Sequence, residues 1–311
     1  MAYSLTDINF KTVADPKGFI EECDAAYNDE ILDVTEEILD HLHTCPIVLL
    51  SGPSGSGKTT TSMKIAEALE KRGVHTHYVG MDDYFLTVDP KTAPRTPEGD
   101  IDFESPLCLD MDLLNKHFSM LERGERIFVP KYLFSRQMRI LEPSKSIKLN
   151  GDEVVVFEGI HALNDMITDV HPEAFKLYIS ARSNVEFDEK IVFKRSWFRL
   201  VRRMVRDFKF RGADPQLTMS MWANVMRGEH KYITPYKKKA DFQFDSSFAY
   251  EPAVFNSYAT ELFKSVPKGI DRFKELRQVL PAIQLFGHID EELVAPDALI
   301  REFIGGGIYE Y

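Results

Sequence analysis

The sequence has few cysteines and no long hydrophobic run, and both absences exclude whole classes of protein. Cys23, Cys45 and Cys108 are scattered and show no paired spacing, which supports neither a disulfide framework nor a zinc site. The apolar stretches are only a few residues long, whereas a membrane-spanning helix needs about 20. The opening residues, MAYSLTDINF, lack the basic region and apolar run of a signal peptide. We therefore expect a cytoplasmic protein without a membrane partner.

Basic residues are also in deficit. The 311 residues include 38 Lys and Arg against 49 Asp and Glu, so the formal net charge is −11. A general nucleic-acid-binding protein needs a basic face for its phosphate contacts, so we expect no nucleic-acid partner. The composition is that of an ordinary globular protein, and the length allows one large domain with extensions.

Short apolar runs alternate with helical stretches along the middle of the chain. Continuous apolar runs are typical of strands buried on both faces in parallel sheets, and helices between them favour crossover connections. We expect strands at 47–50, 75–79, 154–157, 176–180 and 241–245, with a helix at 58–72. The sequence therefore predicts an α/β fold with a mostly parallel central sheet flanked by helices.

Other segments depart from this alternation. Residues 1–44 carry apolar side chains at helical spacing, which predicts an N-terminal helical extension. Residues 87–100 contain three prolines and a glycine, which indicates a long loop. Residues 126–151 show strand-like alternation and turn residues, which favours an inserted β-hairpin.

The strongest signal lies between the first predicted strand and the first predicted helix of the sheet. It matches G-x-x-x-x-G-K-[ST], the phosphate loop, and consists of Gly52, Pro53, Ser54, Gly55, Ser56, Gly57, Lys58 and Thr59. Glycines let the backbone curl so that N–H groups point at phosphate oxygens, and the helix N-terminus adds partial positive charge. In this motif Lys58 reaches the β- and γ-phosphates and the Thr59 hydroxyl ligates Mg²⁺. The motif predicts binding of a nucleoside triphosphate, since a chance glycine-rich turn rarely has this strand–helix context.

Carboxylates follow two of the predicted strands. Glu158 closes the run 154–157, where an acidic side chain beside the phosphate loop can hold Mg²⁺. Asp82 and Asp83 follow the strand at 75–79, and ligands of open α/β sheets bind beyond the carboxyl ends of strands. A carboxylate there can accept the proton of a substrate hydroxyl during phosphoryl transfer. The alternative for these acids is a solvated turn or a helix cap.

Residues 190–211 form a basic segment in an acidic chain. Nine basic residues and one acid, Asp207, give the segment a formal charge of +8. Val201, Met204, Val205 and Phe208 have the spacing of an apolar helix stripe, and Arg199, Arg203 and Arg206 lie along another face. Guanidinium groups match phosphate oxygens, so the pattern predicts a basic helical lid, loose until a polyphosphate binds. A solvated basic face is the alternative.

Seven motifs occur in the order found in uridine kinases. Besides the phosphate loop they are MDDYF (81–85), DFESP (102–106), VPKYLFSRQMR (129–139), VVFEGIHAL (155–163), RLVRRMVRDFKFRG (199–212) and TPYKKKAD (234–241). Over about two thirds of its length the chain thus resembles the phosphoribulokinase/uridine kinase family. The resemblance implies a P-loop kinase domain at 45–254, with a C-terminal extension at 255–311 packed on it. It also implies transfer of phosphate from ATP or GTP, with Mg²⁺, to a nucleoside 5′-hydroxyl, as in pyrimidine salvage of uridine and cytidine.

Residue roles follow from the same resemblance. Asp82 would be the base for the 5′-hydroxyl, Lys58 and Glu158 the other catalytic residues, and Thr59 and Glu158 the Mg²⁺ ligands. Nucleotide-binding residues would be those of the phosphate loop together with Thr60, Arg206 and Arg211. Acceptor-binding residues would be Asp82, Phe85, Glu104, Tyr132, Gln137, Arg139 and Arg203. Among these, the resemblance puts Glu104 at the ribose hydroxyls and Tyr132 in the wall of the base pocket.

Three departures from the family pattern lie on the acceptor side and keep alternatives open. Gln137 stands where relatives carry a base-contacting His, Met221 where a sugar-contacting Gln is common, and Glu104 where Asp is usual. A kinase of the same fold for another small alcohol, such as a sugar phosphate, is therefore the nearest alternative. A GTPase switch would carry N-K-x-D, whereas residues 115–118 read NKHF. A nucleotide sensor without catalytic activity would not need Asp82, Lys58 and Glu158, so their presence argues against that alternative. The donor, ATP or GTP, and a homo-oligomeric state are left open.

Overall fold

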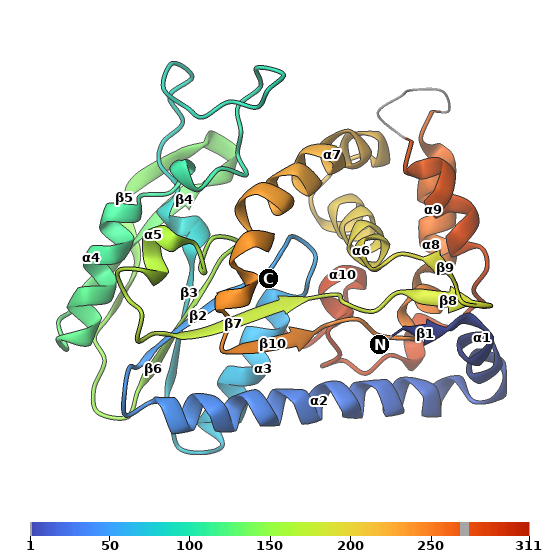
Figure 1. Cartoon of the computed structure of the whole chain (residues 1–311), viewed down its shortest axis with the longest axis horizontal. Coiled ribbons are helices and arrows are strands. Elements are labelled where there is room, and N and C mark those ends of the chain that lie inside the picture. Colours follow the sequence, from blue (N-terminus) through green and yellow to red (C-terminus); the bar gives the residue numbers. More distant parts are fainter. Residues whose placement is uncertain (1, 268–273, 311) are drawn as a thin grey trace.

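A five-stranded parallel sheet lies at the centre of the computed structural model, which describes residues 2–267 and 274–310 (Figure 1). Its order is β10-β7-β2-β6-β3, and every neighbouring pair is parallel. The strands are β2 (Ile47–Ser51), β3 (Thr76–Gly80), β6 (Val154–Glu158), β7 (Phe175–Ser180) and β10 (Phe242–Asp245). Each predicted strand is confirmed to within one residue at either end.

Both faces of the sheet are buried because successive side chains of a strand enter different apolar clusters. On β2, Val48 and Leu50 join the larger cluster, whereas Ile47 and Leu49 join the smaller one. Helices that contribute to the larger cluster are α1 (Leu5–Ala14), α2 (Pro16–His41), α3 (Lys58–Glu70), α6 (Arg195–Phe210), α7 (Pro215–Tyr232), α8 (Glu251–Ser265), α9 (Leu276–Ile283) and α10 (Arg301–Ile304). The smaller cluster is built with α4 (Met111–Glu122) and α5 (Asp165–Thr168).

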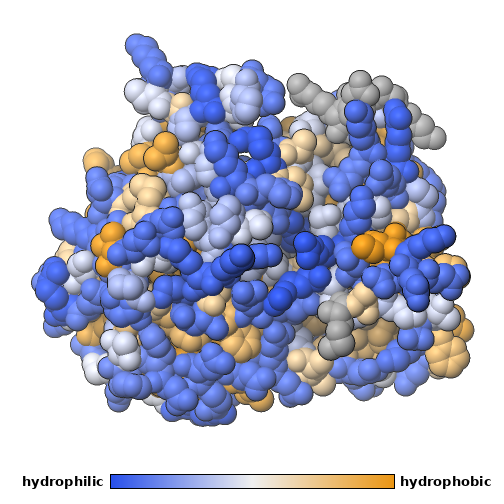
Figure 2. All heavy atoms as spheres, viewed as in Figure 1, coloured by the Kyte–Doolittle hydropathy of each residue, from blue (hydrophilic) through white to orange (hydrophobic). Residues whose placement is uncertain are grey.

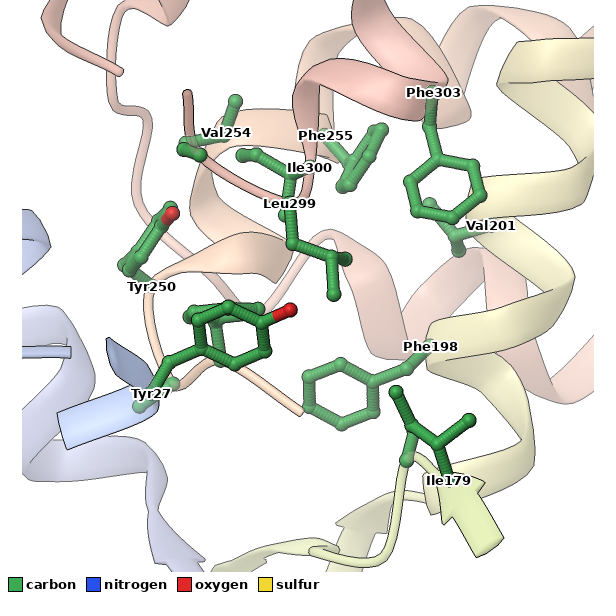
Figure 3. Close-up of a cluster of buried hydrophobic side chains, with 14 of the residues drawn as sticks. Tyr27, Ile179, Phe198, Val201, Tyr250, Val254, Phe255, Leu299, Ile300 and Phe303 are labelled. Atoms are coloured by element: carbon green, nitrogen blue, oxygen red, sulfur yellow. The ribbon is translucent and has the colours of Figure 1, made fainter. Parts of the chain in front are cut away.

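The segments that flank the central domain share its core. Near the N-terminus, β1 (Tyr3–Ser4) pairs in parallel with β8 (Val185–Phe187). Tyr27 of α2, Phe198 of α6 and Leu299 of the C-terminal segment lie together in one apolar cluster (Figure 3). We propose on this ground that 1–44 and 255–311 are extensions that fold together with the central domain.

The predicted hairpin is present as β4 (Ile127–Leu133) and β5 (Met138–Ile147), which pair antiparallel. The register shifts between Val129 and Lys131, where Pro130 cannot donate to the ladder. One-turn helices flank the predicted long loop and close the hairpin. They are η1 (Met81–Tyr84), η2 (Pro106–Cys108) and η3 (Phe134–Arg136), with η4 (Thr234–Lys239) and η6 (Glu291–Leu293) further along.

The basic segment differs from its prediction in two ways. It does not begin as a helix, because β9 (Lys190–Phe193) pairs with β8 and α6 starts only at Arg195. Phe208 is 52% exposed and does not anchor the helix, although the other three residues of its stripe are buried. Most of α6 is packed in the core, and the ordering of the basic segment on nucleotide binding stays a prediction. The two ends of α6 reach the surface, at Arg195 in its first turn and at Phe208 and Phe210 in its last.

The surface offers no membrane-spanning element among the residues described. None of their helices combines the length and the apolar character that a bilayer crossing requires. Figure 2 shows hydrophilic residues over most of one face, interrupted by small apolar patches.

Candidate active site

The phosphate loop, residues 52–57, joins the end of β2 to the start of α3 at the carboxyl edge of the sheet. Gly55 and Gly57 have φ of +75° and +82°, left-handed conformations that glycine adopts without strain. A Cβ on Gly52 would lie 2.1 Å from the carbonyl oxygen of Ile179, so β7 approaches the loop backbone closely. The glycines therefore permit the curled backbone that binds phosphate.

Three arginines of α6 hold this loop from the other side. Arg199 donates to the carbonyl oxygen of Ser54 at 3.2 Å, and Arg202 to that of Gly55 at 3.2 Å. Arg203 donates to the hydroxyl of Ser54 at 3.0 Å. Binding the carbonyl oxygens on the α6 side favours the backbone orientation whose N–H groups face the opposite way, toward a phosphate.

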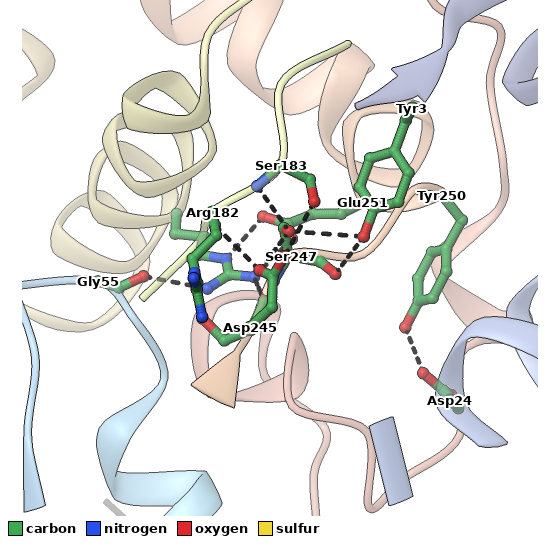
Figure 4. A network of polar contacts seen from close by, with 11 residues as sticks. Tyr3, Asp24, Gly55, Arg182, Ser183, Asp245, Ser247, Tyr250 and Glu251 are labelled. Atoms are coloured by element: carbon green, nitrogen blue, oxygen red, sulfur yellow. Dashed lines mark hydrogen bonds and ion pairs between the residues drawn. The ribbon is translucent and has the colours of Figure 1, made fainter. Parts of the chain in front are cut away.

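Arg202 is itself fixed by a fully buried ion pair. Its guanidinium lies 2.6 Å from the carboxylate of Glu251 at the start of α8, and it also donates to the carbonyl oxygen of Ser246. The side chains are 0% and 1% exposed. Figure 4 shows Gly55 and Glu251 joined through this polar network, with Asp245 at the end of β10 and Ser247 just after it close by. The phosphate loop is thus tied to the C-terminal helices.

Lys58, Glu158 and Tyr78 form a trio between α3, β6 and β3. Lys58 Nζ lies 3.6 Å from Glu158 Oε1, and the Tyr78 hydroxyl donates to Glu158 Oε2 at 2.8 Å. Burial raises the pKa of Tyr78 strongly, and the charge of Glu158 adds to the shift, so the hydroxyl stays protonated and keeps donating. The register of the parallel strands brings these residues together, since Gly80 of β3 lies opposite Glu158.

Asp82 and Asp83 have different surroundings. Desolvation and the charge of Glu158 together raise the pKa of Asp82 to about 6, with Lys58 and Arg211 opposing the shift. Because the Asp82 side chain is exposed to solvent, we attribute its raised pKa to the charge of nearby Glu158 more than to burial. Asp83 instead accepts from the backbone N–H of Tyr132 at 3.3 Å and anchors the hairpin to η1. The Asp82 carboxylate therefore lies in the field of Glu158 and of Lys58, the lysine of the phosphate loop.

Glu104 lies on a loop that is held tightly against α7. Asp102 receives two hydrogen bonds from Arg227, at 2.8 and 3.2 Å, and one from the Tyr232 hydroxyl at 3.0 Å. A Cβ on Gly228 would lie 2.3 Å from Glu104 Cβ, so a glycine is needed where the loop meets the helix. Burial raises the pKa of Glu104 to about 7, and the nearby charge of Arg203 opposes this.

The hairpin contributes an aromatic group beside η1. The ring of Tyr132 lies 5.5 Å from that of Phe85 and 5.0 Å from that of Phe134. Gln137 closes the hairpin in a left-handed conformation with φ of +50°, and its side chain is exposed. Its carbonyl oxygen accepts from the N–H of Val88, so its contact with the long loop is made by the backbone.

Arg139 has partners within the protein. It pairs with Asp110 at 2.8 Å and donates to the carbonyl oxygen of Tyr84 at 2.9 Å. Tyr84 ends η1, the turn that carries Asp82. In this arrangement Arg139 supports the turn, and any contact with an acceptor comes in addition to that role.

Asp207, the single acid of the basic segment, gathers three arginines. Arg203 lies 3.2 Å from it, Arg206 3.1 Å and Arg211 3.5 Å. Arg211 also contributes to the field at Asp82. One buried carboxylate therefore holds several guanidinium groups together near the phosphate loop, where their mutual repulsion would otherwise separate them.

Several contacts of the site were missed in the sequence. Asp102 and Gly228 lie in or near recognised motifs, but their partners lie far along the chain and no spacing indicates them. One of these contacts joins α3 to the C-terminal segment, between residues 242 positions apart in the sequence. Glu302 of α10 accepts from the hydroxyl of Thr60 at 2.8 Å and from its backbone N–H at 3.4 Å.

Comparison with known proteins gives a family match over most of the chain. The model of the phosphoribulokinase / uridine kinase family matches residues 47–249. The uridine kinase of Saccharomyces cerevisiae is 30% identical over 201 residues, which are 64% of this chain and 36% of the yeast protein. The uridine kinase of Deinococcus deserti is 28% identical over 216 residues, 68% of this chain and 93% of that protein. The match thus spans about a third of one relative and nearly all of the other.

A solved structure described as a possible uridine kinase from Bacillus stearothermophilus is also similar. It has a TM-score of 0.45 and 18% sequence identity, and the match covers 70% of this chain and 98% of the other.

Proposed function

The chain belongs to the phosphoribulokinase/uridine kinase family of P-loop kinases, and from this premise we propose that it phosphorylates the 5′-hydroxyl of a nucleoside. The phosphate donor is a nucleoside triphosphate, ATP or GTP, and the acceptor is uridine or cytidine. Pyrimidine salvage in the cytoplasm is the corresponding role. The observation that carries the proposal is the position of Asp82, whose pKa responds to Lys58 and Glu158 of the phosphate site.

Asp82 is suited to align and deprotonate a hydroxyl. With a pKa of about 6 it is mostly ionised at pH 7, yet more basic than an ordinary aspartate. A carboxylate of this kind accepts the proton as the hydroxyl oxygen attacks the γ-phosphorus. The bond to the β-phosphate oxygen breaks at the same time, so no covalent enzyme intermediate is needed.

Charge on the transferring group is balanced by basic side chains of α3, of α6 and of Arg211, which directly follows α6. Lys58 stands beside the loop, and Arg203, Arg206 and Arg211 are gathered on Asp207. Such fixed cations stabilise a transition state because they need no reorganisation when charge develops. We propose that Arg206 and Arg211 contact the donor phosphates, while Arg203 lies between the loop and the acceptor side.

Thr59 and Glu158 fit the requirements of Mg²⁺. Both offer hard oxygen ligands, and Glu158 lies 3.6 Å from the ammonium group of Lys58, the residue before Thr59. When bound there, the ion supplies charge neutralisation across the β- and γ-phosphates. Tyr78 orients Glu158 by donating to its second carboxylate oxygen.

The acceptor pocket rests on a smaller set of contacts. We propose that Tyr132 and Phe85 face the base, Glu104 the ribose hydroxyls, and Gln137 a polar edge of the base. The uridine kinases among the relatives support a nucleoside acceptor. The exposed Gln137 side chain makes the choice of base the least constrained part of the proposal.

A panel of nucleosides and sugar phosphates with Mg·ATP or Mg·GTP tests the function, scored as nucleoside diphosphate release above background hydrolysis. We expect release with uridine and cytidine, and a loss of about 10²–10³-fold in turnover in Lys58→Ala without loss of folding. Release with only a sugar phosphate or polyol would replace the nucleoside by that acceptor. Full turnover in a folded Lys58→Ala variant would contradict the phosphate-loop assignment.

A further inference from the structure

The C-terminal segment reaches into the phosphate site through one carboxylate. Glu302 accepts from Thr60 Oγ1 at 2.8 Å and from the Thr60 N–H at 3.4 Å, although the two residues are 242 positions apart. Thr60 is the third residue of α3, directly after the Lys58-Thr59 pair of the phosphate loop. A residue far outside the motif therefore contacts the turn that the motif uses for phosphate.

The N-cap residue of α3 offers no side-chain acceptor to the first turn of the helix. Gly57 occupies the N-cap position with φ of +82° and has no side chain to receive the N–H groups of the first turn. Glu302, at 9% exposure, is in turn a buried carboxylate that needs donors. The Thr60 hydroxyl and N–H both donate to Glu302 Oε2, so Glu302 provides an acceptor at the turn where Gly57 has no side chain.

The segment that carries Glu302 is firmly held. Arg301 donates to the carbonyl oxygens of Glu291, Val294 and Gly305. Lys209 of α6 donates to the carbonyl oxygen of Ile304 at 3.0 Å. Because these contacts surround Glu302 in sequence, its carboxylate has a fixed place at α3.

Leu299 adds a packing contact to the same loop. A Cβ on Gly57 would lie 2.5 Å from a methyl group of Leu299, so the leucine packs directly on the loop glycine. Figure 3 shows Leu299 beside Tyr27 and Phe198, in the cluster where the N-terminal helix, α6 and the C-terminal segment meet. Apolar and polar contacts of the segment thus converge on Gly57 and Thr60, two residues of the phosphate site that are three positions apart.

We propose that Glu302 is a positioning residue of the nucleotide site, whose carboxylate fixes Thr60 and the first turn of α3. Nucleotide affinity then depends on the C-terminal segment. The inference rests on the proposed function only in taking a nucleoside triphosphate as the ligand. The alternative is that the Glu302 carboxylate competes with phosphate for the positive end of α3. In that case, removing the carboxylate would tighten nucleotide binding.

Two substitutions separate these readings. Glu302→Ala removes the acceptor, and we expect the dissociation constant and KM for Mg·ATP to rise about tenfold, since a hydrogen bond to a charged group is lost. We expect kcat to change by less than about threefold, because Glu302 acts through Thr60 and touches no reacting atom. Glu302→Gln keeps an acceptor oxygen without charge and should recover most of the affinity. Glu292→Ala, an exposed carboxylate in the same segment, serves as the matched control and should behave like the parent protein.

A double-mutant cycle with Thr60→Ala checks the route of the effect. If Glu302 acts through the Thr60 hydroxyl, the double variant should bind Mg·ATP no worse than the weaker single variant. Strictly additive losses would overturn the proposal, and so would tighter binding in both Glu302→Ala and Glu302→Gln. If Glu302→Ala does not fold, Glu302→Gln and Thr60→Ala provide the same test. A Thr60→Ala variant that binds Mg·ATP as tightly as the parent protein would show that the Glu302–Thr60 contact does not affect nucleotide affinity, which would overturn the proposal. Mg·ATP binding is measured without acceptor, so a failure of the nucleoside assay leaves this result independent.

Discussion

The proposed donor and acceptor sides of the site differ in how tightly the rest of the protein holds them. On the donor side the loop carbonyls are bound by arginines of α6, and Arg202 and Glu251 behind them are 0% and 1% exposed. On the acceptor side the hairpin turn carries an exposed Gln137, and Phe134 is 60% exposed. Triphosphate geometry is the same for every donor nucleotide, so a rigid cradle suits it. The acceptor varies among related kinases, and an exposed insertion can change without disturbing the core.

This difference sets what substitutions should do. Changes behind the phosphate loop should cost stability and affect every acceptor equally. Changes in the hairpin or the loop at 102–105 should alter acceptor use while leaving folding and nucleotide binding close to those of the parent protein.

The largest expected effect is the removal of Arg202. Arg202→Ala leaves Glu251 buried without its partner, which typically costs about 3–5 kcal/mol of unfolding free energy. Chemical denaturation followed by circular dichroism measures this cost. Arg123→Ala, which breaks an exposed pair with Glu125, should leave the unfolding free energy close to that of the parent protein, because solvent screens such a pair. Similar losses in the two variants would contradict the view that the donor side is braced from behind.

Asp82→Asn should lower phosphoryl transfer by about 10²–10⁴-fold while nucleotide affinity changes only a few fold, because the amide cannot accept the hydroxyl proton. The melting temperature at pH 7 should not fall. The pKa of Asp82 is higher in the folded chain than in the unfolded one, so folding disfavours its ionised form, and that cost accumulates from pH 3.8 to about 6 and is fully present at pH 7. Asp83→Asn should instead loosen the hairpin, and a larger loss of transfer there than in Asp82→Asn would transfer the base role to Asp83.

The same pKa predicts the acid limit of activity. The ionised carboxylate is the active form, so kcat/KM for the acceptor should fall as pH drops below about 6, rather than below the 3.8 of an ordinary aspartate. A pH–rate profile between pH 4.5 and about 8 measures this limit. An acid limb near 4 would mean that Asp82 does not have its raised pKa in the working enzyme.

A smaller effect is expected where the loop at 102–105 meets α7. Asp102→Asn weakens the paired hydrogen bonds from Arg227 and should raise the acceptor KM about tenfold, since Glu104 loses part of its support. KM for Mg·ATP and the melting temperature should change little. Asp100→Asn, an exposed acid just before the loop, is the control. Equal increases in both KM values would show that the two sides are not separable at this position.

Much of the donor side could be predicted from the sequence, because its elements are local. The strand, the glycine loop and the helix follow one another, and each has its own signal in spacing or composition. The turn between β8 and β9 had no such signal in the sequence. Its residues with positive φ are Asp188 and Glu189, whereas glycine or asparagine there would have indicated a turn. Phe208 was wrongly predicted to lie on the buried face of the helix. The buried face of α6 is determined by its packing against α8 and α10, and the spacing of apolar residues does not indicate these partners. Glu302 on Thr60 and Asp102 on Arg227 could not be predicted, because long-range contacts leave no spacing in the chain.

The smallest expected effect concerns Gln137, where the acceptor side is most open. Its side chain can donate through NH₂ and accept through the carbonyl oxygen, so it can serve both the acceptor at position 4 of uracil and the donor of cytosine. We expect uridine and cytidine to differ by about tenfold or less in kcat/KM. Gln137→Ala should lower both by a similar factor of about five and leave nucleotide hydrolysis without acceptor unchanged. Gln137→Gly also relieves the left-handed backbone at +50°, so equal losses in the alanine and glycine variants would assign the effect to the side chain. Ser135→Ala, an exposed neighbour in the same turn, is the control, and unchanged use of both pyrimidines in Gln137→Ala would remove Gln137 from the acceptor site.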